Sequence, residues 1–182
     1  MEIEKQQLMP ISLGMVHKKG TTHEVICTNN LLQEKYVRAL AKGISESRLF
    51  TKIELRNTKL EDGMAIHLLA AMNSKVVRHL DFSMNPSLTA KFYDELGKVA
   101  SHPDCKLEVL ELEGVKLTDL NLLSISRWLV DCLNIRVLNL SKNEITDKGV
   151  PAICKVMQEC TSLKGLFLHY NRIMMKGGIL LA

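Results

Sequence analysis

Apolar and polar residues alternate through residues 135–140, which read IRVLNL, as a half-buried β-strand requires. The alternation stops at Ser141-Lys142-Asn143, and Thr146-Asp147 then precedes an apolar run, which is a helix start signal. The pattern therefore predicts a strand, a turn closed near an asparagine, and a returning helix.

The same pattern recurs along most of the chain. Its copies start at Phe50 (FTKIELRNTKL), Val77 (VRHLDFSMNPSL), Leu107 (LEVLELEGVKL), Ile135 (IRVLNLSKNEI) and Leu163 (LKGLFLHYNRI), and a weaker one at Thr22 (THEVICTNNLL). Successive starts are 27 to 30 residues apart. Such a period indicates stacked strand–helix units, because no single unit can bury its apolar face alone.

The repeat predicts which residues form the core. In the strand half, the first, fourth and sixth positions point inward, as for Ile135, Leu138 and Leu140. The helix half supplies the opposing wall through residues at helical spacing. Two helical columns are expected in the core: Leu40, Leu68, Leu96, Ile125 and Ile153 in one, and Ile44, Met72, Ala100, Leu129 and Met157 in the other.

Polar residues mark where each strand ends. An asparagine stands there in four copies, at Asn30, Asn85, Asn143 and Asn171, while Thr58 and Val115 replace it in two others. Its amide can satisfy backbone groups of the turn that no neighbouring strand reaches. Thr118 and Thr146 are predicted helix N-caps, because each precedes an acidic residue.

Spacing predicts curvature and domain organisation. Parallel strands lie about 4.8 Å apart and packed helices roughly 8–10 Å apart, so strands should line a concave face and helices a convex one. Residues 1–21 are predicted to form an N-terminal arm or cap, and residues 22–182 a domain of six repeats, the last incomplete. We expect further repeats or another chain to cover the C-terminal edge, because solenoids need covered ends.

Each copy follows L-x-x-L-x-L-x-x-N-x-L, the leucine-rich repeat pattern. The period near 28 and the segment ITDKGVPAICKVM at 145–157 resemble the ribonuclease-inhibitor-like subclass of leucine-rich repeat proteins over residues 22–182. This resemblance implies an α/β horseshoe solenoid with a parallel concave sheet and convex helices. It says little about function, because that subclass includes inhibitors, sensors, GTPase regulators and cytoskeletal components.

Composition narrows the class of protein. The chain is 46% hydrophobic and 24% charged, which is ordinary for a soluble globular protein. It lacks the run of roughly 18 apolar residues that a membrane span needs, and MEIEKQQLMP has no secretory signal pattern. We therefore expect a cytoplasmic protein without membrane contact. With 24 basic and 20 acidic residues and no long run of like charge, nucleic acid is not favoured.

No residue pattern indicates catalysis, a cofactor or a metal. The five cysteines form no C-x-x-C, and Cys105, Cys132 and Cys160 recur just before strands, as reduced apolar fillers would. The six histidines show no ligand spacing, and His67 is predicted to be a partly buried structural residue. Trp128 is interpreted as helix-to-helix packing, with an exposed partner anchor as the alternative.

The outward face of the strands is the remaining candidate site. Glu54, Asp81 and Glu111 share one position on successive strands and predict an acidic stripe. Like charges on adjacent strands are unfavourable, so the stripe suggests a cationic partner, with a solvated face of no specific role as the alternative. Phe167, His169 and Tyr170 suit a protein interface, or pack on whatever covers the sixth repeat. The candidate partner-binding residues are Glu54, Arg56, Arg78, Asp81, Glu111, Glu113, Arg136, Phe167, His169 and Tyr170.

These patterns predict a non-catalytic scaffold that binds a partner protein through its concave strand face. The resemblance implies membership of a larger assembly, such as a ciliary or other cytoskeletal complex, as one setting. One rival is a regulator of a small GTPase, similar to Ran GTPase-activating proteins, with Arg56 or Arg78 as a positioned arginine. Another is the ligand-sensing repeat domain of an innate-immunity-type receptor.

Overall fold

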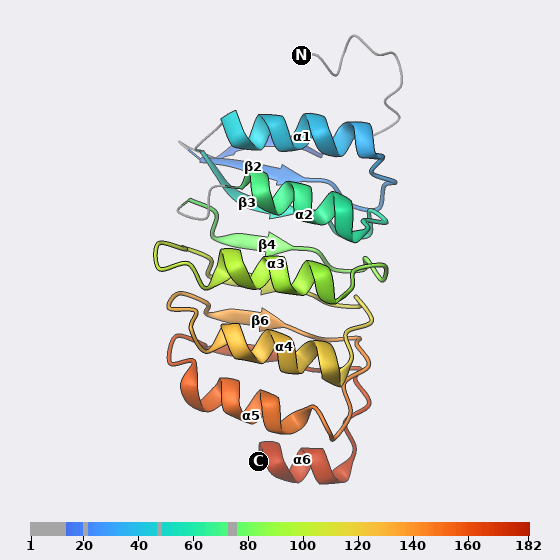
Figure 1. Cartoon of the computed structure of the whole chain (residues 1–182), viewed down its shortest axis with the longest axis vertical. Helices are drawn as coiled ribbons and strands as arrows, with labels where there is room; N and C mark the ends of the chain where they lie inside the picture. Colours follow the sequence, from blue (N-terminus) through green and yellow to red (C-terminus); the bar gives the residue numbers. More distant parts are fainter. Residues whose placement is uncertain (1–13, 20–21, 47–48, 73–75) are drawn as a thin grey trace.

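The computed structural model describes residues 14–19, 22–46, 49–72 and 76–182. These residues form one seven-stranded sheet with helices along one face (Figure 1). In chain order the elements are β1 (Gly14–Lys19), β2 (Thr22–Ile26), α1 (Glu34–Glu46), β3 (Phe50–Glu54), α2 (Asp62–Ala71), β4 (His79–Asp81), α3 (Ala90–Ala100), β5 (Val109–Glu111), α4 (Asp119–Leu129), β6 (Val137–Asn139), α5 (Val150–Glu159), β7 (Gly165–Phe167) and α6 (Met175–Leu181).

Strands β2 to β7 are parallel and follow one another across the sheet in sequence order. Their register brings the same repeat position side by side, so Ile53, Leu80, Leu110, Leu138 and Leu166 form one row. The predicted α/β solenoid, with one helix returning after each parallel strand, is confirmed.

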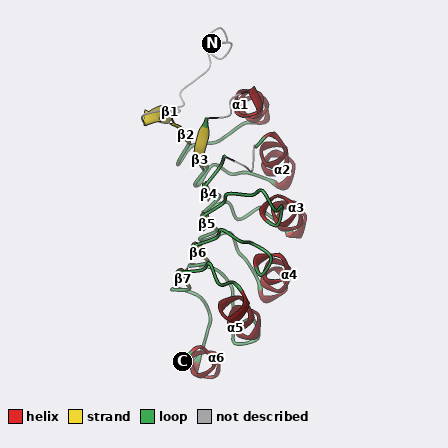
Figure 2. Cartoon of the chain, turned by 90° about the vertical axis from the view of Figure 1, so that its left-hand side faces the viewer, coloured by secondary structure: helices red, strands yellow, loops and turns green. Residues whose placement is uncertain are grey.

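The stack of repeats is curved. Figure 2 shows the strands on the inner side of an arc and the helices on its outer side. This is the consequence expected of strands that pack more closely than helices. None of the helices in the described ranges is long and apolar enough to cross a membrane.

The core follows the predicted columns with three exceptions, which are Leu40, Met72 and Met157. Leu68, Leu96, Ile125 and Ile153 are buried, as predicted. Leu40 is only partly buried, because α1 turns Val37, Ala41 and Ile44 to the core. Met157 is 51% exposed, because α5 buries Val150, Ile153 and Val156 and leaves Met157 on its flank. The core position of Met157 was therefore predicted wrongly. Leu40 and Met72 are only partly buried, although both pack against the core.

The turn after each parallel strand contains one residue in the left-handed backbone conformation. Its φ angle lies between 53° and 64° at the same position of every repeat, in Asn29, Asn57, Met84, Gly114, Lys142 and Tyr170. This conformation turns the chain out of the strand direction. The sequence did not reveal it, because only one of the six residues is a glycine.

The asparagines act between repeats as well as within them. The Asn85 amide donates to the carbonyls of Leu55 and Phe82, both at 2.8 Å, and its oxygen accepts the N–H groups of Thr58 and Leu60. Asn143 repeats this arrangement with Leu112, Leu140, Val115 and Leu117. The repeats in which threonine or valine replaces the asparagine are therefore closed by the asparagine of the following repeat.

One of the two predicted N-caps is confirmed. Thr118 forms a reciprocal capping box with Asn121 at the start of α4. Thr146 does not cap α5, which begins at Val150 after Gly149, with Pro151 in its first turn. The Thr146 hydroxyl instead donates to Asp119 of the preceding repeat.

The N-terminal edge of the sheet is formed by β1, which runs antiparallel to β2. Strand β1 belongs to the segment predicted as an arm or cap, and residues 1–13, 20 and 21 of that segment lie outside the described residues. The division into residues 1–21 and 22–182 stays a prediction.

Candidate functional site

The outward side chains of the parallel strands and their following turns form the concave face of the arc. We use this term for the second, third, fifth, seventh and eighth positions of each repeat, counted from Thr22, Phe50, Val77, Leu107, Ile135 and Leu163. Hydrogen bonding to neighbouring strands, on both sides for β2 to β6 and on one side for β7, fixes the backbone beneath these residues. The face therefore presents its side chains from a rigid support.

The structure brings the three carboxylates of the acidic stripe together. Glu54, Asp81 and Glu111 are register partners on β3, β4 and β5. Two of them have a cationic or titratable neighbour on the face itself. Lys52 Nζ lies 2.7 Å from Glu54 Oε2, and His79 Nε2 lies 2.9 Å from Glu111 Oε1. The hydrogen bond from His79 holds the pKa of Glu111 below its usual value.

Asp81 is the least accessible member of the stripe, with only 4% of its surface exposed. Its Oδ1 accepts the Ser83 N–H at 2.7 Å. Burial raises its pKa, and the nearby Glu111 and Glu54 act in the same direction. Asp81 therefore offers a partner little surface, although the sequence placed it among the contact residues.

Glu113 is the centre of a second charged group. Although 8% exposed, it lies 2.9 Å from Arg56 Nη1 and 2.7 Å from Lys142 Nζ. The Arg56 hydrogen bond is the main cause that lowers the Glu113 pKa, and Lys142 adds to it. Arg56 reaches past the third repeat to make this contact, because the small Ser83 occupies the intervening position.

Glu108 links two further arginines on the face. It forms an ion pair with Arg78, and one of its oxygens lies 3.9 Å from Arg136 Nε. More than half of each arginine side chain is exposed. The cations that the acidic side chains need are therefore supplied by the chain itself, whereas the sequence suggested that a partner would provide them.

Phe167, His169 and Tyr170 lie together at the C-terminal end of the face. The His169 ring packs edge-on against Phe167 at 6.5 Å and against Tyr170 at 5.4 Å between centroids. His169 Nδ1 is 2.9 Å from the Ser141 hydroxyl. Phe167 is 47% exposed and Tyr170 77% exposed. The structure thus gathers the predicted aromatic residues on an accessible surface.

Two lysines beside these aromatics were not among the predicted contact residues. Lys164 is exposed at the second position of the sixth repeat, and Lys142 occupies the left-handed turn position of the fifth. Lys142 could not be placed from the repeat pattern, because the pattern specifies apolar residues and asparagine but not the side chains of the turn.

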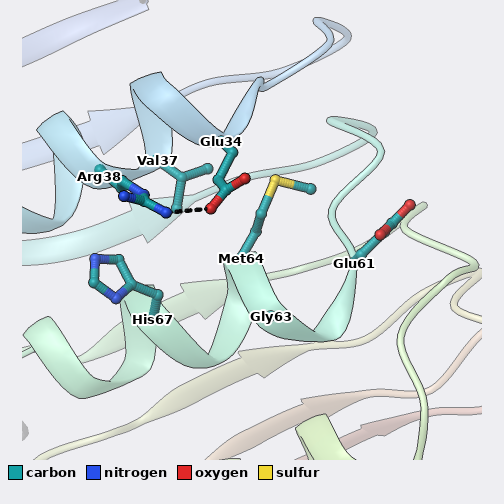
Figure 3. Close-up of a pocket in the computed structure, with 7 residues that line it drawn as sticks. All are labelled: Glu34, Val37, Arg38, Glu61, Gly63, Met64 and His67. Atoms are coloured by element: carbon teal, nitrogen blue, oxygen red, sulfur yellow. Dashed lines mark hydrogen bonds and ion pairs between the residues drawn. The ribbon is translucent and has the colours of Figure 1, made fainter.

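The convex side has a groove of about 540 Å³ between α1 and α2 (Figure 3). Glu34, Arg38 and His67 line it, and Arg38 donates to Glu34 at 2.6 Å. His67 is exposed, so the prediction of a partly buried histidine was wrong. Ala65, Leu68 and Leu69 take the core side of α2, which turns His67 outward.

The remaining sequence candidates serve the core. Cys105, Cys132 and Cys160 are free and buried, as predicted, and burial raises the pKa of Cys132 to about 12. Trp128 packs against Gly97 of the preceding helix, which confirms helix-to-helix packing. Within the ranges that the structure describes, no three histidine, cysteine or acidic side chains are grouped as metal ligands would be.

Comparison with known proteins agrees with the repeat geometry. A family model described as Leucine Rich repeat matches residues 131–154, the segment that contains β6 and the start of α5. No curated protein matches the chain. The match, together with six strand–helix units in one register, supports a leucine-rich repeat protein with an α/β solenoid fold.

Proposed function

We propose that this chain is a non-catalytic protein-interaction module that binds a partner protein through the concave face. Leucine-rich repeats are generally protein-interaction modules. The observation that carries the proposal is the group of exposed side chains on rigid strands: Arg78, Arg136, Phe167 and Tyr170. Arginine and aromatic residues of this kind contribute most of the binding energy at protein interfaces.

Binding by such a face needs no cofactor and little rearrangement. Each turn is closed by hydrogen bonds to the neighbouring repeat, as Asn85 and Asn143 show. The side chains are therefore positioned before a partner arrives, and less conformational entropy is lost on binding. The buried Asp81 and Glu113 help to position their neighbours, and the exposed residues make the contacts.

The proposal also favours a simple interaction module over a GTPase regulator. A regulator that acts through an arginine needs a guanidinium free to reach the bound nucleotide. Arg56 is bonded to Glu113, and Arg78 is paired with Glu108. Binding in that mode would have to break one of these ion pairs first.

Three finer points of the proposal rest on sequence. They are the ribonuclease-inhibitor-like subtype, a cytoplasmic location within a larger assembly of the cytoskeletal type, and further repeats or another chain at the C-terminal edge. The exposed Met174, Met175 and Ile179 near that edge are consistent with the last point.

Site-specific photo-crosslinking tests the proposed face. A photoreactive phenylalanine analogue is placed at Phe167, at Arg136 or, as the convex control, at Leu123 of α4, which is also exposed. We expect one and the same crosslinked protein from Phe167 and Arg136 in cell extract. With the analogue at Arg136, adding Phe167→Ala/Tyr170→Ala should abolish this crosslink. A partner that crosslinks from Leu123 and from neither concave position would contradict the proposal.

A further inference from the structure

The charges of the concave face are divided unequally between repeats. In the fourth repeat the concave positions hold Glu108, Glu111 and Glu113 and no cation. In the fifth and sixth repeats they hold no carboxylate: Arg136, Val137, Asn139, Ser141 and Lys142 in the fifth, and Lys164, Gly165, Phe167, His169 and Tyr170 in the sixth. The two C-terminal strands therefore carry a basic surface, which we call the β6–β7 surface.

Each acidic residue on the concave face of the fourth repeat has a partner in the second or third repeat. Glu111 is paired with His79, Glu108 makes its closer contact with Arg78, and Glu113 is shared between Arg56 and Lys142. Arg136 consequently keeps only a 3.9 Å contact with Glu108. Within the described part of the chain, no ion pair involves Lys164.

The same surface has an apolar centre. Val137, the register partner of Gly165 on β6, and Phe167 of the same strand both lie close to Gly165, where a Cβ atom would be 3.7 Å from the Phe167 ring and 3.8 Å from Val137 Cγ2. Those distances are ordinary contacts, so the missing side chain leaves a shallow apolar position. Arg136 and Lys164 directly precede Val137 and Gly165, which places the two cations beside it.

We propose that the β6–β7 surface binds an acidic peptide segment that carries one apolar or aromatic residue, an inference that rests on the proposed function. The apolar side chain packs over Gly165 between Val137 and Phe167. Carboxylates of the segment pair with Arg136 and Lys164, while Lys142 stays bound to Glu113 and adds positive charge beside them. Opposite charges speed the encounter and fix its register, and the apolar contact supplies affinity.

An acidic protein segment fits this surface better than a nucleic acid. Binding along a phosphate backbone relies on many cations, whereas this surface has three and the whole chain has a net charge of only +4.

Fluorescence anisotropy with defined probes tests the inference on the full chain. The first probe is a labelled ten-residue peptide of alternating Asp and Glu with one central Phe. The second has Asn and Gln in place of the acids, the third has Gly in place of Phe, and the fourth is a ten-nucleotide oligothymidylate. We expect the first to bind most tightly, with binding that weakens as salt is raised.

Variants identify the surface. Arg136→Glu/Lys164→Glu should weaken binding of the first peptide by about tenfold or more. Lys148→Glu/Lys155→Glu, an equal charge change at two exposed lysines in the convex half of the fifth repeat, should leave it unchanged. Gly165→Leu should block the apolar position, and Gly165→Ala, which creates no overlap, should have a small effect. Thermal unfolding confirms that each variant is folded.

Three results would overturn the inference. In the first, Arg136→Glu/Lys164→Glu and Lys148→Glu/Lys155→Glu weaken binding of the first peptide equally. In the second, the oligothymidylate binds more tightly than that peptide, and in the third the acidic peptide does not bind at all. If the acidic peptide fails while the same partner still crosslinks from Phe167 and Arg136, the proposed function stands and only the acidic chemistry is rejected. If the crosslinks fail as well, both are rejected.

Discussion

Asp119, at the start of α4, accepts two hydrogen bonds from Thr146 of the following repeat: its Oδ1 accepts the backbone N–H at 2.8 Å, and its Oδ2 accepts the hydroxyl at 2.6 Å. Gly149 allows this approach, because a Cβ atom there would lie 2.5 Å from Asp119 Oδ1. Asp62 binds Thr89 in the same way, and Asp147 accepts the Met174 N–H at 2.7 Å.

Asp62, Asp119 and Asp147 occupy the same repeat position, and the repeat that lacks this aspartate explains why α4 has a capping box. Ala90 occupies the aspartate position in the third repeat and offers no acceptor to the fourth. Thr118, which would have used it, bonds instead to Asn121 of its own helix. An aspartate on one repeat and a capping box on the next are therefore alternative solutions to the same unsatisfied N–H.

Replacing Asp119 by alanine tests the inter-repeat role. Asp119→Ala removes both acceptors of Thr146, and we expect the free energy of unfolding to fall by about 1–2 kcal/mol, measured by urea denaturation. Ala90→Asp is the matched control. Because Thr118 is already satisfied, we expect it to change stability by less than about 0.5 kcal/mol. A larger gain from Ala90→Asp than loss from Asp119→Ala would show that the two arrangements are not equivalent.

Asp81 predicts a pH dependence of stability. Its folded pKa lies above the usual aspartate value, because burial opposes the charged form. The folded state therefore favours the protonated carboxyl, so this group's contribution is fully present below its unfolded pKa and is lost as pH rises through its folded pKa. Above its folded pKa, the ionised Asp81 destabilises the fold.

Asp81→Asn should remove that cost. The equivalent residue of β6 is already an asparagine, and Asn139 Oδ1 accepts the Ser141 N–H at 3.0 Å as Asp81 accepts that of Ser83. We expect the variant to be more stable than the wild type at pH 7, by on the order of 1 kcal/mol. The gain should shrink as pH falls through the raised folded pKa and vanish below the unfolded aspartate pKa of about 3.9. Urea unfolding from pH 3 to pH 8 measures this, and a gain independent of pH would point to a cause other than the charge.

The sequence predicted the fold well, because apolar side chains at Ile135, Leu138 and Leu140 and their copies are what the stacked core consists of. It predicted the position of Arg56 and Glu113 on one face but not their pairing, since that contact skips an entire repeat. The sequence also suggested that the acidic stripe of Glu54, Asp81 and Glu111 needs a cationic partner. The stripe's partners Lys52 and His79 occupy another column, and only the observed side-chain directions bring the columns together.

Lys142 tests the left-handed turn position. Its φ angle is 56°, a conformation that costs a residue with a Cβ about 1–2 kcal/mol. Lys142→Ala and Lys142→Gly both lose the ion pair with Glu113, so they differ only in backbone preference. Despite the greater flexibility of glycine in the unfolded chain, we expect Lys142→Gly to be the more stable by about 0.5–1 kcal/mol. Equal stability in thermal unfolding would show that the turn does not strain ordinary residues.

Gly97 of α3 and Trp128 of α4 pack closely together, since a Cβ atom at Gly97 would lie 2.7 Å from Trp128 Nε1. Glycine to alanine inside a helix ordinarily stabilises by about 1 kcal/mol. At Gly97 we expect overlap with the indole to reverse the sign and lower the free energy of unfolding by about 1–3 kcal/mol.

Two further variants isolate the indole as the cause. Gly43→Ala in α1, where no atom lies within 4 Å of the added Cβ, should show the ordinary gain. In a Trp128→Leu background, Gly97→Ala should no longer destabilise, because the smaller side chain leaves room for the methyl group. A double-mutant cycle by urea denaturation measures this coupling. If Gly97→Ala still lowered the free energy of unfolding in the Trp128→Leu background, the indole would not be the cause.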